Sequence, residues 1–224
     1  MPIKKIIAIG SAKGGVGKSS ITALLALSLS KHKKVGILDA DIYGPNQNIL
    51  FSLDSKNTIL NKKIMPAEKK GIKIISMGNI LNYDDAAIWR GPMLSGAIKK
   101  LINDTVWDNL DYLLIDMPPG TGDAYLTVFK ELIIDEFILI TTPNKLAISD
   151  TQKTITMLRK LNINILGFIF NNIFNVKNFD NSFFLSNKID HLGTYEFDKN
   201  ILDLNLDFNC LVTNKISKII MSDV

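Results

Sequence analysis

The chain has 224 residues, enough for one large domain and too few for two comfortable ones. Hydrophobic residues make up 46% of it and charged residues 21%, which argues against an intrinsically disordered protein. The formal net charge of +4 is small, so we expect no nucleic acid partner. The single cysteine, Cys210, excludes an internal disulfide framework and a metal site made of several cysteines from one chain.

No part of the sequence is expected to cross a membrane or to direct secretion. The apolar stretch at 6–9 is too short for a signal peptide. The longest apolar run, 132–140, is interrupted by Asp135 and Glu136 and is shorter than a membrane span. We therefore expect a cytoplasmic protein without stable membrane insertion.

Short β-branched runs alternate with longer helical patterns along the chain. Several of these runs are continuously apolar, as expected of strands covered on both faces. The predicted strands are Lys5–Gly10, Lys34–Leu38, Ile72–Met77, Tyr112–Ile115, Phe137–Thr141 and Ile165–Phe170. The predicted helices are Lys18–Lys31, Pro92–Val106, Ala124–Ile133 and Leu146–Leu161. This alternation predicts one three-layer α/β domain over residues 1–224, with a mainly parallel central sheet.

Residues near helix ends support these assignments. Pro92 suits a first helical turn, where its missing N–H costs nothing. We place Asp150 in the first turn of the helix over 146–161, and Arg159 and Lys160 in its last turn, in agreement with the helix dipole. The C-terminal 216–221 segment is expected to form a core-packing helix, the alternative being a short membrane-seeking one.

The sequence SAKGGVGKS, residues 11–19, follows a predicted strand and opens a predicted helix. Its glycines permit a tight turn whose N–H groups point inward and bind anions, and the helix N-terminus strengthens that field. We expect Lys18 to reach the β- and γ-phosphates of a nucleotide and Ser19 to bind Mg²⁺. The alternative is a glycine-rich turn without a ligand. The predicted nucleotide contacts in this loop are Ala12, Lys13, Gly14, Gly15, Val16, Gly17, Lys18, Ser19 and Ser20.

One position departs from the strict phosphate-loop pattern. That pattern has glycine where this chain has Ala12. A methyl group is tolerated there if the residue keeps a negative φ, so we treat the change as small.

Carboxylates follow two of the predicted strands. Asp39 and Asp41 come after the strand over 34–38, and Asp116 follows the strand over 112–115. Because parallel sheets bind ligands beyond the carboxyl ends of their strands, these acids should lie near the phosphates. We expect Asp39 and Asp116 to support Mg²⁺ and Gly120 to donate its N–H to the γ-phosphate. Spacing alone does not decide whether Asp39 or Asp41 positions the attacking water, and a lone acid here is more often a turn or cap residue.

The loop sequence KGGVGKS, with Lys13 at its start, resembles the deviant phosphate loop of the MinD, ParA, nitrogenase iron protein and Mrp group. In that group the first lysine reaches across a dimer interface to the nucleotide of the other subunit. The resemblance therefore implies a homodimer formed through Lys13 and ATP, and assigns catalytic roles to Lys13, Lys18 and Asp41. Without it, Lys13 would be a solvated loop lysine.

A narrower resemblance is to the Mrp/ApbC family of iron–sulfur cluster carrier ATPases. It rests on DADIYGPN at 39–46, WRGPM at 89–93, IDMPPGTGD at 115–123, TTP at 141–143, LAISD at 146–150 and GFIFN at 167–171. The resemblance implies that Asn171 contacts the adenine base, the alternative being that it caps a strand end.

The same resemblance reveals a departure. Family members follow the equivalent of Asn171 with a segment that contains Cys-x-x-Cys, and two such pairs hold one bridging 4Fe–4S cluster. Here residues 172–191 are shortened and contain no cysteine. Such clusters generally take four thiolates, so this chain offers no identifiable ligand and an iron–sulfur cofactor is doubtful. We expect Cys210 to be a small buried hydrophobe.

The phosphate loop and the carboxylates predict an Mg-ATP-hydrolysing protein, and the resemblance implies that it acts in iron–sulfur cluster assembly or delivery. It would be a divergent carrier or the partner of a cysteine-bearing carrier or client. One alternative is a MinD- or ParA-like ATPase whose dimer positions a partner on a membrane or DNA. Another is a regulator that binds ATP and hydrolyses it poorly.

Overall fold

The fold is built on a central, mostly parallel β-sheet. In a computed structural model of the chain, the described residues are 3–53, 57–79, 91–143, 145–177, 179–196, 198, 206 and 210–222. Within them, eight strands are ordered β10-β9-β8-β1-β7-β2-β6-β5, and only β5 runs antiparallel to its neighbour. The strands are β1 (Ile3–Gly10), β2 (Val35–Asp39), β5 (Ala67–Lys69), β6 (Ile72–Ser76), β7 (Leu110–Asp116), β8 (Glu136–Thr141), β9 (Ile165–Asn172) and β10 (His191–Glu196).

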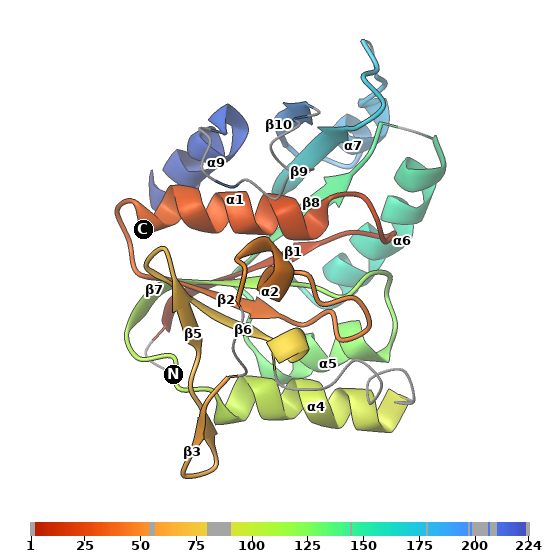
Figure 1. Cartoon of the computed structure of the whole chain (residues 1–224). Coiled ribbons are helices and arrows are strands. Elements are labelled where there is room, and N and C mark those ends of the chain that lie inside the picture. Colours follow the sequence, from red (N-terminus) through yellow and green to blue (C-terminus); the bar gives the residue numbers. More distant parts are fainter. Residues whose placement is uncertain are drawn as a thin grey trace.

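Helices cover both faces of this sheet (Figure 1). The helices are α1 (Lys18–Ser30), α2 (Gln47–Leu50), α4 (Gly91–Asp104), α5 (Asp123–Glu131), α6 (Lys145–Lys160), α7 (Ser182–Ser186) and α9 (Leu211–Ser222). Helices α1, α2 and α9 contribute to one hydrophobic cluster, and α4, α5, α6 and α7 contribute to another on the opposite face. The predicted three-layer α/β architecture is confirmed.

Successive strand residues are divided between the two clusters. In β1, Ile7 and Ile9 belong to the cluster under α1, whereas Ala8 belongs to the cluster under α4 and α5. In β7, Leu113 and Leu114 are divided in the same way. Because side chains alternate across a strand, a strand that is covered on both faces needs apolar residues at every position. This explains the continuous apolar runs in the sequence.

All six predicted strands and all four predicted long helices are present, with ends that shift by at most two residues. Pro92 lies in the first turn of α4, and Arg159 and Lys160 lie in the last turn of α6, as expected. The position of Asp150 was wrong. Helix α6 begins at Lys145 and has no acidic residue in its first turn. Asp150 falls in the second turn, where its side chain pairs with Lys13.

The elements that the sequence did not predict are short or lie at an edge of the sheet. They are the strands β5 and β10, the short helices α2 and α7, a 3-10 turn at Met77–Asn79, and a separate hairpin of β3 (Ile59–Leu60) and β4 (Lys63–Ile64). Two- and three-residue strands are too short to show a period. Among the described strands, β10 pairs with β9 alone. Its HLGTYE sequence mixes polar and apolar residues without strict alternation.

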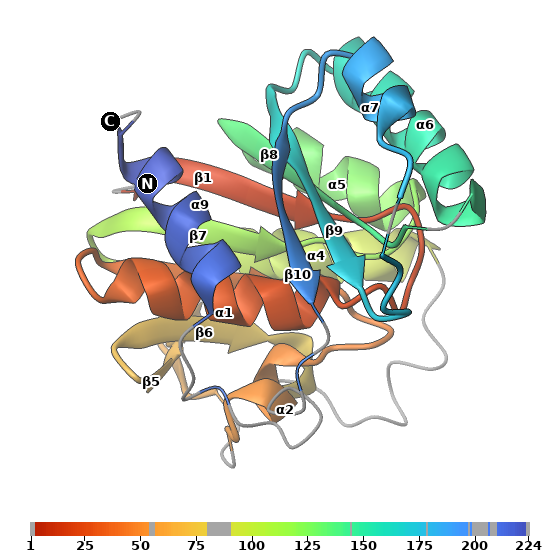
Figure 2. The same ribbon diagram turned by 90° about the horizontal axis from the view of Figure 1, so that it is seen from above.

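Helix α9 packs against α1, as both views show (Figures 1 and 2). Ile216 and Ile220 of α9 are fully buried, which confirms the expected core-packing helix. Cys210, just before α9, is 8% exposed and belongs to the same cluster, which confirms that it is a small buried hydrophobe. Among the residues described, no helix has both the length and the apolar character that crossing a bilayer requires.

Candidate nucleotide-binding site

The predicted site lies where the three central strands β1, β7 and β2 end. The loop after β1 leads into α1, and Asp39 and Asp116 occupy the last positions of β2 and β7. Their Cα atoms are register partners, so the two carboxylates stand side by side. The parallel topology thus brings the loop and the acids to one edge of the sheet, as the sequence predicted. The Trp89–Arg90 part of the WRGPM motif falls outside the described residues.

The loop has the backbone conformation that its glycines permit. Gly15 and Gly17 adopt φ values of +76° and +83°, in the left-handed region that residues with a Cβ seldom enter. Ala12 has no positive φ, which satisfies the condition under which its methyl group is tolerated. Gly17 caps α1, whose first turn contains no acidic residue. The N–H groups and positive dipole end of α1 therefore favour an anion at this loop.

Asn171, at the end of β9, supports the loop from the side. Its Nδ2 donates a hydrogen bond to the main-chain oxygen of Val16 at 2.8 Å. A Cβ placed on Gly17 would lie 2.1 Å from that same Nδ2. Asn171 is 4% exposed and its Oδ1 accepts no hydrogen bond from the described residues. It therefore lies inside a strand and contacts the loop, and its predicted contact with adenine stays a prediction.

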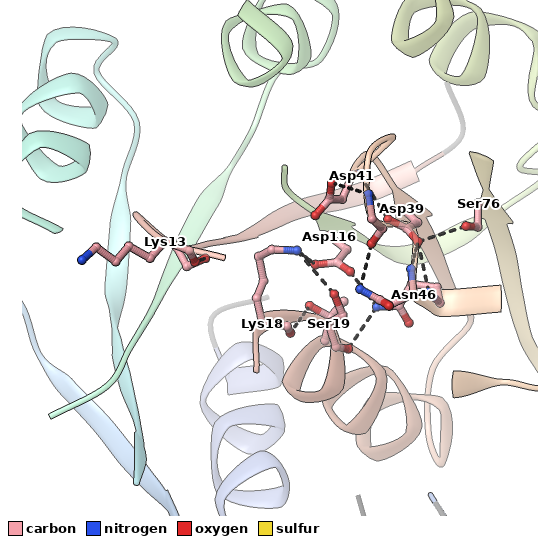
Figure 3. A network of polar contacts seen from close by, with 12 residues as sticks. Lys13, Lys18, Ser19, Asp39, Asp41, Asn46, Ser76 and Asp116 are labelled. Atoms are coloured by element: carbon pink, nitrogen blue, oxygen red, sulfur yellow. Dashed lines mark hydrogen bonds and ion pairs between the residues drawn. The ribbon is translucent and has the colours of Figure 1, made fainter. Parts of the chain in front are cut away.

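Lys18 forms a buried ion pair with Asp116. Lys18 Nζ lies 2.5 Å from Asp116 Oδ1 and 3.5 Å from Ser19 Oγ, and Lys18 is only 6% exposed (Figure 3). Burial by itself would lower the pKa of Lys18, but the charge and hydrogen bond of Asp116, with the charges of Asp39 and Asp41, raise it. Lys18 is therefore a fixed cation at the base of the loop.

Asp39, in the network of Figure 3, is fully buried, as Asp116 is. Its Oδ2 accepts hydrogen bonds from the main-chain N–H groups of Asn46 and Gln47 and from Ser76 Oγ, at 3.0, 3.1 and 3.0 Å. Burial, then repulsion from Asp116, raises the pKa of Asp39 to about 7. Asp39 thus holds the start of α2 in place. A role in supporting Mg²⁺ stays a prediction for it.

Asp41 borders an open pocket of about 330 Å³ beside the loop. Its Oδ1 accepts a hydrogen bond from the Gly44 N–H at 3.2 Å, and burial raises the pKa of Asp41. The pocket is also bordered by Ser11, Lys13, Gly14, Gly15, Gly17, Lys18, Ser19, Ser20, Asn46, Ile49, Leu50 and Pro119. Of Asp39 and Asp41, Asp41 is the one that borders this pocket.

Lys13 points away from the carboxylate network, as Figure 3 shows. Its Nζ lies 3.1 Å from Asp150 Oδ2 on α6, and its side chain is 46% exposed. Asp150 also has Lys153 Nζ 3.5 Å from its other oxygen. The two lysines of the loop thus differ: Lys18 is buried on Asp116, and Lys13 lies at the surface in an exchangeable ion pair.

Gly120 has a φ of +84° and lies in the loop after β7. Its N–H donates to the main-chain oxygen of Ser11 at 3.2 Å. A contact between this N–H and a γ-phosphate would have to replace that long bond, so the predicted role of Gly120 stays a prediction.

The residues around Asp116 have the chemistry that Mg²⁺ prefers. Ser19 Oγ and the Asp116 and Asp41 carboxylates are oxygen ligands, and Mg²⁺ in phosphate sites is held by one or two such groups together with the phosphates. In the described part of the chain, no group of three or more His, Cys, Asp or Glu side chains could hold a metal by itself. The site therefore fits a cation that arrives with a nucleotide.

An apolar cavity of about 650 Å³ adjoins the phosphate pocket and shares Lys13, Gly14 and Gly15 with it. Its other lining residues include Val16, Pro143, Leu146, Ile173, Phe174 and Val176. We call Leu146, Ile173 and Phe174 the apolar rim, because they are 71%, 40% and 60% exposed. Cys210 lines a different cavity, between α1 and α9.

The sequence did not single out several residues of the site. Gln47 and Ser76 are polar side chains to which the sequence assigned no role, and the fold brings them to the carboxylates. Asp150 belonged to the LAISD motif, but its contact with Lys13 of the loop was not expected. Asn46 was part of a motif but had no assigned role.

Comparison with known proteins identifies the family. The family model described as "ParA: NUBPL iron-transfer P-loop NTPase" matches residues 2–200. This chain belongs to that family. It is 44% identical over 173 residues to the "Iron-sulfur cluster carrier protein" of Pseudomonas fragi, and 47% identical over 170 residues to that of Rickettsia felis. The matches cover 75% of this chain but only 60% and 54% of those relatives, so the chain spans somewhat more than half of their length.

Solved structures support the fold of this family member. A nucleotide-binding protein from Archaeoglobus fulgidus in complex with ADP is 32% identical and has a TM-score of 0.75, with 96% of this chain and 88% of that chain covered. The Pyrococcus horikoshii septum site-determining protein MinD, complexed with Mg-ADP, has a TM-score of 0.76 at 22% identity, with 97% and 96% covered. The second likeness concerns the fold alone.

Proposed function

We propose that this chain binds and hydrolyses Mg-ATP and acts in iron–sulfur cluster assembly or transfer as a member that depends on a partner for the cluster. One observation carries the ATPase part: the buried Lys18–Asp116 pair lies directly beside the glycine loop and the Asp41 pocket. Such a charge arrangement is what phosphoryl transfer requires, since catalysis there is positioning and charge neutralisation without a covalent nucleophile.

The proposed roles follow from the geometry. The loop N–H groups and the α1 terminus bind the phosphates, and Lys18 moves from Asp116 to the β- and γ-phosphates. Bound Mg²⁺ neutralises charge that builds up on the phosphates. Asp41, at the pocket, orients the attacking water, and a raised pKa suits it to receive a proton. Ser19 and Asp116 would bind the Mg²⁺ ion, and Asp39, next to Asp116 in the sheet, would support them.

The test of this proposal is phosphate release by the purified protein with Mg-ATP. We expect Lys18→Ala and Asp41→Ala each to reduce the rate by about 100-fold or more, because each removes one charge-positioning group. Lys34→Ala, at a surface site before β2, is the control and should leave the rate unchanged. Unchanged phosphate release in both site variants would overturn the catalytic assignment.

A homodimer is the assembly that we propose for the ATP-bound protein. The apolar rim and Lys13 lie on the same side of the loop, next to the phosphate pocket. Exposed apolar side chains grouped at a site edge are typical of an interaction surface. A second copy would cover the apolar rim. Lys13 of the first copy would then leave Asp150 and contact the nucleotide bound to the second copy.

The partner-dependent part of the proposal rests on the thiols. Iron–sulfur clusters are held by cysteine thiolates, usually four. Two copies of this chain supply two, both Cys210, and each is buried in its own core. A cluster would therefore have to be carried by a cysteine-bearing partner, while this chain supplies the ATPase.

A further inference from the structure

Gln47 joins the two sides of the proposed cation site. It is the first residue of α2 and is fully buried. Its Nε2 donates one hydrogen bond to Asp116 Oδ2 at 2.8 Å and another to the main-chain oxygen of Ser19 at 3.0 Å. The Gln47 side chain thereby connects the end of β7 to the first turn of α1. Its two partners, Asp116 and Ser19, are labelled in Figure 3.

The orientation of this amide is determined by its partners. A carboxylate oxygen and a main-chain oxygen both accept, so the NH₂ group and not the carbonyl must face them. The carbonyl Oε1 is left buried and accepts no hydrogen bond from the described residues. Burying a polar atom without a partner is unfavourable. Gln47 therefore holds Asp116 and Ser19 at a local energetic penalty that an apolar residue would avoid.

Gln47 and Lys18 divide the Asp116 carboxylate between them. Lys18 contacts Oδ1 and Gln47 contacts Oδ2. If Lys18 turned to the phosphates as proposed above, the bond from Gln47 would still hold the carboxylate and would keep it from rotating. Because the amide is neutral, it fixes the carboxylate without cancelling the negative charge that a cation needs.

We propose that Gln47 is a positioning residue that sets Asp116 and Ser19 for the magnesium ion of Mg-nucleotide. This rests on the proposed nucleotide function, and it assigns to Gln47 a contribution to magnesium-dependent binding specifically. Gln47 does not border the phosphate pocket, whereas the loop glycines do. Its loss should therefore weaken the cation side of the site and leave the phosphate contacts of the loop in place.

The test is titration with a fluorescent ADP analogue, once with Mg²⁺ and once with EDTA. In wild type we expect Mg²⁺ to tighten binding. Gln47→Met keeps the side-chain length without donors, and it should weaken binding about tenfold with Mg²⁺ and less than twofold with EDTA. Gln152→Met on the exposed face of α6 is the matched control and should bind like wild type under both conditions.

The outcomes are distinguishable. If wild type binds no nucleotide under either condition, the proposed function fails and the role of Gln47 fails with it. If wild type binds and Gln47→Met loses equal affinity with and without Mg²⁺, or none, the function stands and the positioning role is overturned. Should Gln47→Met not fold, Gln47→Asn is measured in its place. It keeps an amide too short to reach both acceptors, so the same selective loss is expected.

Discussion

At the level of single residues, sequence motifs predicted the residues of the phosphate loop and its carboxylates, but not the residues that hold them in place. Lys18, Asp116 and Asp41 could be found because each lies in a recognisable pattern at or after the end of a predicted strand. The structure brings them together. Gln47 could not be found, because a glutamine directly after the DADIYGPN motif carries no signal of its own in the sequence. Its importance comes from burial and from two acceptors that lie 28 and 69 residues away along the chain.

The protonation of Asp39 leads to a prediction about stability. Its pKa is about 7 in the folded protein against 3.8 for the ordinary group, so the folded state holds this proton more tightly than the unfolded chain. The stabilisation from that proton is fully present below pH 3.8 and is lost as the pH rises through 7. We therefore expect the free energy of unfolding, without nucleotide or Mg²⁺, to decline over this range.

Urea unfolding at intervals between about pH 4.5 and 8 measures this effect. Asp39→Asn cannot titrate, so its stability should fall less than that of wild type between those pH values. Asp108→Asn changes an exposed acid and should keep the wild-type slope. Parallel curves for wild type and Asp39→Asn would show that Asp39 does not carry this proton.

At the level of elements, long periodic segments were predictable and short ones were not. The parallel strands and long helices follow from apolar runs and helical periods that packing on both faces of a sheet requires. The β3–β4 hairpin and β10 depend on neighbours that only the fold supplies. The position of the phosphate loop also depends on contacts between elements, since Asn171 of β9 donates a hydrogen bond to the loop between β1 and α1.

Gly17 is where conformation and packing of the loop meet. Gly17→Ala would place a methyl group at a φ of +83° and against Asn171 Nδ2. Gly71 has a similar φ of +72°, and no atom lies within 4 Å of the position that a Cβ would take there. We expect Gly71→Ala to cost about 1–2 kcal/mol of unfolding free energy from its backbone alone. Gly17→Ala should cost about 1 kcal/mol more, because Asn171 must also give up its bond to Val16.

Denaturant unfolding of the two variants gives this difference directly. Combining Gly17→Ala with Asn171→Ala removes the steric contact. The double variant should therefore lose less unfolding free energy than the sum of the losses in the two single variants. Equal losses for Gly17→Ala and Gly71→Ala would mean that the contact with Asn171 is relieved without energetic consequence.

At the level of the whole molecule, the family and the fold agree with the sequence, whereas assembly and cargo rest on proposals. Membership follows from the family match over residues 2–200. The Lys13–Asp150 pair could not have been predicted, because Asp150 was expected to serve its own helix. This ion pair bears on the proposed assembly, because Lys13 would have to leave Asp150 of its own subunit before it could contact the nucleotide of a second subunit.

Light scattering on a size-exclusion column tests the assembly. In an Asp41→Ala background, which we expect to hold ATP without turnover, Mg-ATP should give a dimer of twice 24.9 kDa. Adding Lys13→Ala should leave a monomer. Lys153→Ala also removes a partner of Asp150 and should still dimerise, so it is the matched control. A dimer that persists in Lys13→Ala would contradict the proposed role of Lys13.

Anaerobic treatment with iron and sulfide tests the cargo. We expect the chain alone to acquire no charge-transfer absorption and no stoichiometric iron, because its thiols are too few and buried. The Pseudomonas fragi iron–sulfur cluster carrier protein, treated in parallel, is the positive control. Charge-transfer absorption in the chain alone would contradict this expectation. If the absorption persisted in Cys210→Ser, the cluster would have ligands other than cysteine. If it disappeared, Cys210 would have left the core to bind the cluster.

Two adjacent asparagines at the end of β9 connect the phosphate loop with the start of the divergent segment. Asn171 holds the phosphate loop at Val16, and Asn172 closes the turn that follows, through bonds to both main-chain groups of Val176. Two neighbouring residues of one strand end thus hold both the phosphate loop and the turn over 173–176, which begins the segment where the family resemblance would place cysteines. This chain therefore keeps a structural connection between its phosphate loop and a segment that contains no cysteine.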